Sequence, residues 1–241
     1  MNLKPRIFLK TSELSPEKKN EAEFLYLILA GIFIASLVSC NLIFQKFFYW
    51  YPMGFPLFEI SVGILPYPIT FLVTDIISEI YGQRRANAVV TAGLVASVFV
   101  LGMVTLANIL PSTEWSPVSS ELFTKVFGLT GVSVGASMCA YLLAQYIDIR
   151  VFHFWKRVTH GKHLWIRNNA STLTSQLVDT TVVMLLMCGM GVIDWSLFWP
   201  LFGSGYLFKA IIALLDTPFM YFFTWLIRKR LGLVEAQEVV Y

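Results

Sequence analysis

Residues 168–193 read NNASTLTSQLVDTTVVMLLMCGMGVI, and Asp179 is the only charged residue among them. A stretch of this length and polarity is typical of a helix that crosses a lipid bilayer, which needs roughly 20 apolar residues. A carboxylate near the middle of such a helix costs about 2.5–3.5 kcal/mol on insertion scales, so either the fold stabilises it or a ligand requires it. The stretch therefore predicts a membrane protein and makes Asp179 a candidate functional residue.

The composition of the whole chain supports the same class. Apolar residues make up 56% of the 241 residues, charged residues make up only 14%, and the mean hydropathy is +0.67. Few soluble domains combine these values. The length accommodates about six membrane spans of roughly 20 residues each. We therefore expect an all-α, polytopic membrane protein with a transmembrane domain over residues 23–230, between cytoplasmic tails at 1–22 and 231–241.

Charged residues divide the apolar sequence into six predicted spans. Four of them contain no charged residue, the fifth contains only Asp179, and the sixth contains only Lys209 and Asp216. The predicted spans are residues 24–45, 60–74, 86–113, 126–147, 168–193 and 195–227. Since charged side chains within a membrane are costly, the three interrupting residues are candidates for function.

The distribution of Lys and Arg predicts the orientation of these spans. Fifteen of the 18 basic residues lie in the amino-terminal tail, the second and fourth connections and the carboxyl-terminal tail. Lys46 and Lys125 lie on the opposite side, and Lys209 lies within the sixth span. Because Lys and Arg close to span ends stay in the cytoplasm, we expect both termini to be cytoplasmic.

The sequence disfavours several other classes of protein. The amino terminus mixes acidic with basic residues, and its apolar segment is too long for a cleaved signal peptide. The net charge of +3 reflects the basic loops and gives no reason to expect a nucleic-acid partner. Cys40, Cys139 and Cys188 lie in different spans without metal-ligand spacing, so we interpret them as packing residues. We expect no metal and no cofactor.

The second predicted span contains residues that disturb a helix. Gly63, Pro66 and Pro68 precede Thr70, and proline cannot donate a backbone hydrogen bond. A broken helix at membrane depth is tolerated where protein or a cavity receives the freed carbonyl groups, and such breaks often mark transporter sites. The pattern predicts a broken second helix, with a simple proline kink as the alternative.

Three aspartates are expected at the same depth in the membrane. Counted from the nearest basic residue of the cytoplasmic side, Asp75, Asp179 and Asp216 lie roughly 13–18 Å deep at the helical rise of about 1.5 Å per residue. The middle of the hydrocarbon core lies about 15 Å deep. Lys209 is two helical turns from Asp216 and could partly neutralise it. An anionic surplus remains, which a cationic substrate, a proton or a metal cation would balance.

Polar residues recur near these aspartates at helical spacing, so that each set shares one helix face. The sets are Asp75 and Glu79; Asn41 and Gln45; Tyr141, Gln145 and Asp148; and Thr172, Gln176 and Asp179. Glu79 and Asp148 are expected near the cytoplasmic boundary, where pairing with Arg84, Arg85 or Arg150 is the alternative interpretation. The sets predict a polar interior inside an apolar bundle.

Five short patterns, in order along the chain, resemble the queuosine precursor transporter family, whose members are also called vitamin uptake transporters and have six spans. The patterns are Asn41 with Lys46, PITFLVTDIISEIYGQRRA at 68–86, YLLAQYID at 141–148, WIRNNASTLTSQLVD at 165–179 and FKAIIALLDTP at 208–218. Each pattern is short, but together they cover nearly the whole chain after residue 40.

The resemblance implies uptake of 7-deazaguanine bases for tRNA modification, through the cytoplasmic (inner) membrane of a bacterium. The bases are 7-cyano-7-deazaguanine, 7-aminomethyl-7-deazaguanine and queuine, among which the sequence does not choose. Carboxylates and amides suit the donors and acceptors of a guanine-like edge, and aromatic rings at Tyr67, Phe71, Tyr141 and Trp165 suit stacking. The candidate substrate-binding residues are Asn41, Asp75, Asn169, Gln176 and Asp179. The candidate gating or proton-handling residues are Lys46, Glu79, Lys209 and Asp216.

Other readings of the sequence stay open. The chain could be the substrate-capturing subunit of an energy-coupling-factor vitamin importer, which would need an ATPase partner because no P-loop pattern occurs here. An intramembrane enzyme is less favoured, because the three histidines all lie in one basic connection and no nucleophile motif is present. TFLVTD at 70–75 and TSQLVD at 174–179 suggest two inverted three-helix repeats. A homo-oligomer is compatible with the sequence.

Overall fold

The computed structural model describes residues 8–10, 14–50, 58–128, 130–191, 193–233 and 237–240 and is almost entirely helical. The long helices are α1 (Pro16–Ile43), α2 (Tyr67–Ile109), α4 (Thr130–Val158), α5 (Leu164–Gly189) and α6 (Phe198–Leu231). Within the described part, the stretches Pro16–Ile43, Val62–Ile109, Leu164–Gly189 and Trp195–Leu231 are long and apolar enough to cross a membrane. The prediction of an all-α chain with several membrane-length helices is confirmed, while the number of crossings stays a prediction.

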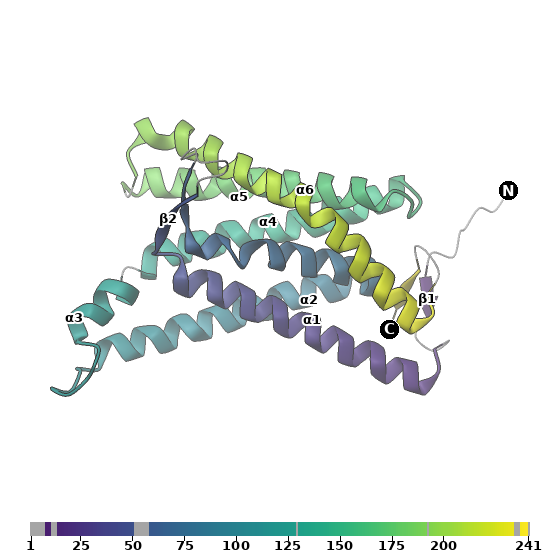
Figure 1. Ribbon diagram of the computed structural model, residues 1–241, viewed down its shortest axis with the longest axis horizontal. Coiled ribbons are helices and arrows are strands. Elements are labelled where there is room, and N and C mark those ends of the chain that lie inside the picture. Colours follow the sequence, from purple (N-terminus) through teal and green to yellow (C-terminus); the bar gives the residue numbers. More distant parts are fainter. Residues whose placement is uncertain are drawn as a thin grey trace.

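Short elements close the two ends of the bundle. Strands β1 (Phe8–Lys10) and β4 (Glu238–Val240) pair in parallel, and β2 (Phe47–Trp50) pairs antiparallel with β3 (Phe58–Ser61). The remaining short elements are the 3-10 helices η3 (Val62–Ile64) and η5 (Trp195–Leu197), the four-residue helix α3 (Ser120–Phe123) and the π-helix η4 (Thr124–Gly128). Figure 1 shows the two strand pairs at opposite ends of the molecule.

Helix α2 reverses direction at Gly82. The backbone of Gly82 has φ 77° and ψ 173°, a conformation that is essentially restricted to glycine. Figure 1 shows the two halves of α2 running in opposite directions from this bend. The second and third predicted spans therefore form one helical hairpin.

The basic connections gather at one end of the bundle. Figure 1 shows the start of α1, the bend of α2, the turn between α4 and α5 and the end of α6 together at the end that carries β1 and β4. Ion pairs join these segments, including Arg85 with Glu23 at 2.8 Å and Arg230 with Glu21. Lys4 and Arg6, which contribute to the predicted charge bias, lie outside the described residues. The described basic segments lie at a common end, as the charge bias predicts.

The predicted break in the second helix is wrong in its position. Residues 58–64 form β3 and η3, and α2 begins only at Tyr67, with Pro66 as its N-cap and Pro68 in its first turn. Proline is tolerated there because the amide groups of the first turn have no intrahelical partner. The prolines therefore start a helix rather than interrupt one, and the span expected from residue 60 is helical only from Tyr67.

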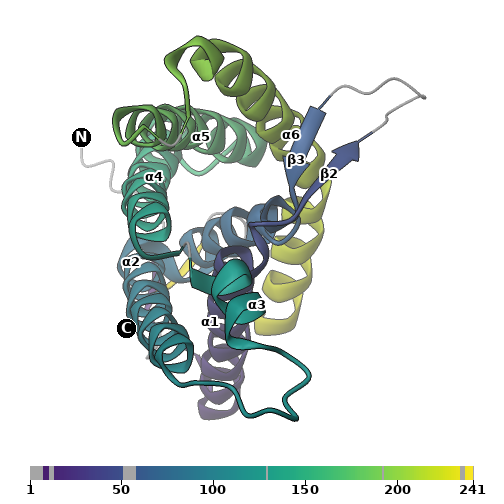
Figure 2. The same cartoon turned by 90° about the vertical axis from the view of Figure 1, so that its left-hand side faces the viewer.

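The distribution of side chains is inverted relative to a soluble protein. Large apolar residues such as Phe99 and Trp199 are 67% and 73% exposed on the outside of the bundle. Its interior combines an apolar core with many buried polar residues, of which Thr74, Glu79 and Gln145 are all 0% exposed. Helix α1 packs against α2, and α4 packs against both α2 and α5. Helix α5 also packs against α6. Figure 2 views this arrangement from the end that carries β2 and β3. An apolar outside with a polar inside is what a lipid environment requires.

Candidate functional site

A cavity of about 250 Å³ lies near the end of the bundle that carries β2 and β3. Helices α1, α2, α4, α5 and α6 all contribute to its wall, and η3 contributes non-helical backbone. Its polar and aromatic lining residues are Asn41, Ser61, Tyr67, Tyr141, Asp179 and Lys209. Non-helical backbone at membrane depth is tolerated where it lines a cavity, and η3 lies at such a place.

An ion pair forms one side of this cavity. The Nζ atom of Lys209 on α6 lies 2.6 Å from Oδ2 of Asp179 on α5 and 3.4 Å from the hydroxyl of Thr180. Only 5% of the Asp179 side chain and 15% of the Lys209 side chain is exposed. Lys209 therefore neutralises Asp179, whereas the sequence suggested Asp216 as its partner. Pairing with a lysine offsets much of the cost of a carboxylate at this depth.

Aromatic rings form a second side of the cavity. Tyr67, Phe71 and Tyr141 contact one another with ring centroids 5.3–6.0 Å apart. Lys209 lies 4.8 Å from the centroid of the Tyr67 ring, a distance at which a cation is attracted to the ring face. Trp165, also expected as a stacking residue, is 54% exposed on the outside instead. Tyr67 and Tyr141 thus offer aromatic rings next to the ion pair, while Phe71 packs against them without lining the cavity.

The candidate amides fall into two groups. The Nδ2 atom of Asn41 on α1 is buried and has no hydrogen-bond acceptor among the described residues, and Oε1 of Gln176 on α5 likewise has no donor. Asn169, in contrast, donates from Nδ2 to the carbonyl of Trp165 at 2.9 Å and contacts the hydroxyl of Thr217 on α6 at 2.8 Å. Asn41 and Gln176 hold unused hydrogen-bonding groups, whereas Asn169 is engaged in joining α5 to α6.

Asp75 lies in a separate buried layer. It is 1% exposed and lines neither the cavity nor the smaller pocket beside it. Its carboxyl group lies close to the carboxyl group of Asp148 on α4 and to the hydroxyl group of Thr172 on α5. Asp148 is 0% exposed and accepts a hydrogen bond from Ser175 at 2.9 Å. The expected pairing of Asp148 with Arg150 is therefore wrong, because α4 continues to Val158 and carries Asp148 into the interior.

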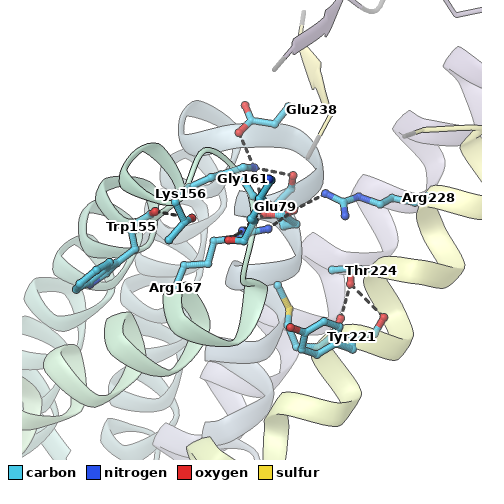
Figure 3. Close-up of polar contacts among 12 residues, drawn as sticks. Glu79, Trp155, Lys156, Gly161, Arg167, Tyr221, Thr224, Arg228 and Glu238 are labelled. Carbon is cyan, nitrogen blue, oxygen red and sulfur yellow. Dashed lines mark hydrogen bonds and ion pairs between the residues drawn. The ribbon is translucent and has the colours of Figure 1, made fainter. Parts of the chain in front are cut away.

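Glu79 lies at the centre of a cluster of basic side chains, shown in Figure 3. Arg167 of α5 donates from Nε and Nη2 to its two carboxylate oxygens at 3.1 and 2.7 Å, and Lys156 of α4 lies 3.1 Å away. Arg228 of α6 pairs with the same carboxylate. Glu79 is thus bound to three cations from three helices, and not to Arg84 or Arg85 as the sequence suggested.

Strand β4, which lies after the last predicted span, also contacts the cluster around Glu79. Glu238 of β4 lies 2.6 Å from Lys156 and is 5% exposed. Burial raises the pKa of the Glu238 carboxyl above its usual value, while Lys156 acts in the opposite direction. Lys156 therefore bridges Glu79 and Glu238, which ties β4 to the basic end of the bundle.

The remaining candidates lie apart from these groups. Asp216 is half-buried on α6 and lines the smaller pocket together with Tyr67, Thr172 and Gln176. The side chain of Lys46 is exposed, and its backbone pairs with Val62. Of the residues predicted from the sequence, Asn41, Asp179 and Lys209 meet at the main cavity. Asp148 lies in the interior outside the main cavity and not at the cytoplasmic boundary, although its spacing from Tyr141 and Gln145 already placed it on the polar face of α4.

The geometry of the cavity suits a small planar molecule with a polar edge, held by a carboxylate, an amide and aromatic rings. Residues 61–223 match the model of a protein family described as "Putative vitamin uptake transporter". The chain belongs to the vitamin uptake transporter family. It is also 29% identical over 163 residues to the "Probable queuosine precursor transporter" of Bacillus subtilis (strain 168), covering 67% of this chain and 70% of that protein. No solved structure matches the chain.

The match to the family includes most of the site. Asp75, Asp148, Asp179 and Lys209 all lie between residues 61 and 223, whereas Asn41 on α1 lies before the matched region. The chain is therefore a transporter-family protein whose described helices include several of membrane length.

Proposed function

We propose that this protein is a six-pass carrier that imports a 7-deazaguanine base across the inner membrane of a bacterium, with both termini in the cytoplasm. The basic end of the bundle would then face the cytoplasm, since Lys and Arg near span ends stay on that side. The cavity between the helices would lie toward the outer side, close to β2 and β3. Glu79 and its three basic partners would lie between the cavity and the cytoplasm.

The composition of the cavity carries this proposal. Asp179 can accept hydrogen bonds from the exocyclic amine and ring N–H of a guanine-like base, while the unpaired Nδ2 group of Asn41 can donate to its carbonyl oxygen. Tyr67 and Tyr141 can stack on the bicyclic ring. The name of the Bacillus subtilis relative supports a queuosine precursor as the substrate. Gln176 and Asp216 line the adjoining pocket, where we place the substituent at position 7.

Two other functions predict different experimental results. A substrate-capturing subunit of an energy-coupling-factor importer would bind the base but require a separate ATPase chain for uptake. An intramembrane enzyme would release a chemically altered base. Uptake of unaltered base by the purified chain in lipid vesicles would distinguish the carrier from both.

The direct test uses cells that cannot make queuosine. The chain is expressed in these cells, each of the three bases is supplied in turn, and queuosine in tRNA is measured. We expect at least one base to restore queuosine. Absence of restoration by all three, with the protein present in the membrane, would contradict the proposed substrate class.

Asp179→Asn provides the matched test of the cavity. The neutral amide keeps the shape but removes the charge that pairs with Lys209, so we expect loss of uptake. Because this change also leaves a lysine without its partner, a second variant exchanges the two charges, Asp179→Lys with Lys209→Asp. If the pair serves only to stabilise the protein, the exchange should restore both expression and uptake. We expect it to restore expression alone.

A further inference from the structure

Asp75 and Asp148 form a pair of carboxyl groups inside the bundle, where α2, α4 and α5 meet. They are 1% and 0% exposed, and their carboxyl groups lie close enough to interact with each other. Hydroxyl groups contact each acid from α5, namely Thr172 at Asp75, and Ser171 and Ser175 at Asp148. The pair lies in a layer of its own and does not line the cavity proposed for the substrate.

One buried oxygen of each acid has no hydrogen-bond donor among the described residues. Oδ1 of Asp75 and Oδ2 of Asp148 are both buried, and neither accepts a hydrogen bond from any donor in the described part of the chain. Two ionised carboxylates in contact can only repel each other, because each oxygen is an acceptor. One proton shared by the two acids would convert this repulsion into a hydrogen bond.

The charged side chains near Asp75 and Asp148 form ion pairs with other residues. From α2, Glu79 faces the pair, but Lys156 of α4, Arg167 of α5 and Arg228 of α6 bind its carboxylate. Across the cavity, Lys209 is paired with Asp179. Other titratable groups of the surrounding helices include His153 and Tyr141 of α4, Tyr67 of α2 and Asp216 of α6. Among the described residues, no lysine or arginine forms an ion pair with Asp75 or Asp148.

We propose that Asp75 and Asp148 bind one exchangeable proton between them and form the proton site that couples substrate import to a proton gradient. The inference rests on the carrier function proposed above. In each cycle the doubly ionised pair takes up one proton from the outer side, which changes its charge from two negative to one. The pair returns that proton to the cytoplasmic side after the substrate has left, and no bond other than O–H forms or breaks.

A proton fits this site better than a metal cation does. A calcium ion takes about six to eight oxygen ligands, and the described residues contain no group of three or more His, Cys, Asp or Glu side chains that could hold a metal. Glu79, which the sequence suggested for proton handling, is less suited because three cations hold its charge in place. The site therefore lies one helical turn deeper on α2 than the sequence suggested.

The position of the pair links it to the substrate cavity. Thr172, which contacts Asp75, lies on the same face of α5 as Gln176 and Asp179. Thr74, the residue before Asp75, donates to Gln145 at 3.2 Å, and Gln145 donates to the hydroxyl of Tyr141 at 2.7 Å in the cavity wall. Thr172 and the hydrogen bonds from Thr74 through Gln145 to Tyr141 thus lie between the pair and the cavity wall.

The test uses the full chain, purified and reconstituted in lipid vesicles, with the radiolabelled base that restores queuosine in cells. Two measurements are made for the wild type and for the variant Asp148→Asn. Asp148 is chosen because it does not line the cavity. The first is exchange of labelled for unlabelled base without any gradient. The second is accumulation when the outside is one pH unit more acidic than the inside. Coupling to one proton allows accumulation of up to about tenfold for that gradient.

We expect the wild type to exchange base and to accumulate it several-fold, and Asp148→Asn to exchange base but not to accumulate it. Absence of exchange by the wild type would overturn the proposed function itself. Exchange without gradient-driven accumulation by the wild type, or normal accumulation by Asp148→Asn, would overturn the proton site alone. Accumulation driven by a sodium gradient at equal pH would assign the pair to sodium and would likewise overturn it.

A readout independent of transport tests the shared proton directly. Infrared spectra of the protein at neutral pH should contain the carbonyl band of a protonated carboxylic acid, because the pair holds one proton. That band should be lost in Asp75→Asn and also in Asp148→Asn, since the amide of either asparagine can donate to the remaining carboxylate. Ser175→Ala, which removes a hydroxyl next to Asp148 but leaves both acids, should retain the band. Equal band intensity in all four proteins would contradict a shared proton.

Discussion

Asn41 and Asn169 show how two residues with the same side chain serve different purposes in this protein. Both were expected to bind substrate from their positions in the sequence. Asn169 uses its amide to contact Trp165 and Thr217, so it contributes to the packing of α5 on α6. Asn41 leaves its Nδ2 group without an acceptor in the cavity wall. A buried donor without a partner costs about 1–3 kcal/mol, so its presence suggests that a ligand supplies the acceptor.

Asn41→Ala should weaken substrate binding without weakening the fold. Loss of one hydrogen bond to the base corresponds to about 1 kcal/mol, or roughly a fivefold higher KM for uptake. Asn169→Ala is the matched control, because it should lower the thermal midpoint of the purified protein and leave KM nearly unchanged. Uptake kinetics and thermal unfolding in detergent would measure both effects. A higher KM in Asn169→Ala than in Asn41→Ala would reverse the assignment.

The sequence predicted the burial of polar residues better than it predicted their partners. Helical spacing places Thr172, Gln176 and Asp179 on one face, and all three are buried. Spacing along one helix cannot show which side chain of another helix will be opposite, because that depends on how the helices pack. The pairing of Asp179 with Lys209 therefore appears only in the folded structure. Asp148 was assigned to the boundary because Arg150 follows it, yet the exposed Arg150 lies on another face of the same helix.

The bend of α2 is an element built around a single glycine. The half of α2 before Gly82 contains about 15 residues, or roughly 22 Å of helical rise, which is shorter than a hydrocarbon core of about 30 Å. The irregular residues of η3 precede this half and line the cavity. A short helix followed by a sharp reversal thus places Asp75 and Glu79 inside the bundle, with the Gly82 bend at the basic end. No pattern in the sequence distinguished Gly82 from the other glycines.

Gly82→Ala should destabilise the protein by about 1–3 kcal/mol, because a residue with a side chain is strained at this φ and ψ. The added Cβ would also lie 2.7 Å from a carboxylate oxygen of Glu238, so that side chain would have to move. Gly31→Ala in α1 is the control, since no atom lies within 4 Å of its added Cβ and alanine favours a helix. Thermal unfolding should show a lower midpoint for Gly82→Ala only. Equal midpoints for the two variants would contradict the strained bend.

The cluster around Glu79 joins separate elements at the basic end of the bundle. Its members come from α2, α4, α5 and α6, and Lys156 extends it to β4. Removing one partner of a buried ion pair is costly because the other charge stays buried without compensation. The cluster should therefore hold this end of the bundle closed in the conformation described here.

Glu79→Gln should reduce the amount of folded protein, because it leaves Arg167 and Arg228 without their anion and Lys156 with Glu238 alone. The expected destabilisation is about 3–5 kcal/mol, seen as a lower thermal midpoint and less monodisperse protein after extraction. Glu23→Gln is the control, since the Glu23–Arg85 pair is partly exposed and such pairs contribute about 0–1 kcal/mol. If Glu79 were the proton carrier that the sequence suggested, Glu79→Gln would fold normally and lose only gradient-driven accumulation.

On the scale of the whole molecule, the apolar outer faces of the helices enclose the buried polar side chains. Contact of these polar side chains with lipid would be costly. Polar layers follow one another along the bundle, from Asp179 and Lys209 in the cavity, through Asp75 and Asp148, to Glu79 at the basic end. In the import that we propose, these layers would follow one another from the outer side to the cytoplasmic side. The arrangement requires that both halves of α2 cross the membrane, because Asp75 would otherwise lie outside the helix bundle at membrane depth.

Reporter fusions test this arrangement through the number of crossings. If both halves of α2 cross, a reporter placed after residue 118 should lie outside, and reporters placed after residue 157 and at the carboxyl terminus should lie in the cytoplasm. If the 48 residues from Val62 to Ile109 crossed only once, the reporter after residue 118 would lie in the cytoplasm instead. The basic residues favour the first result, because Arg84 and Arg85 stand at the bend and would stay on the cytoplasmic side. A cytoplasmic reporter after residue 118 would remove the bend from the cytoplasmic face and, with it, the path proposed for substrate and proton.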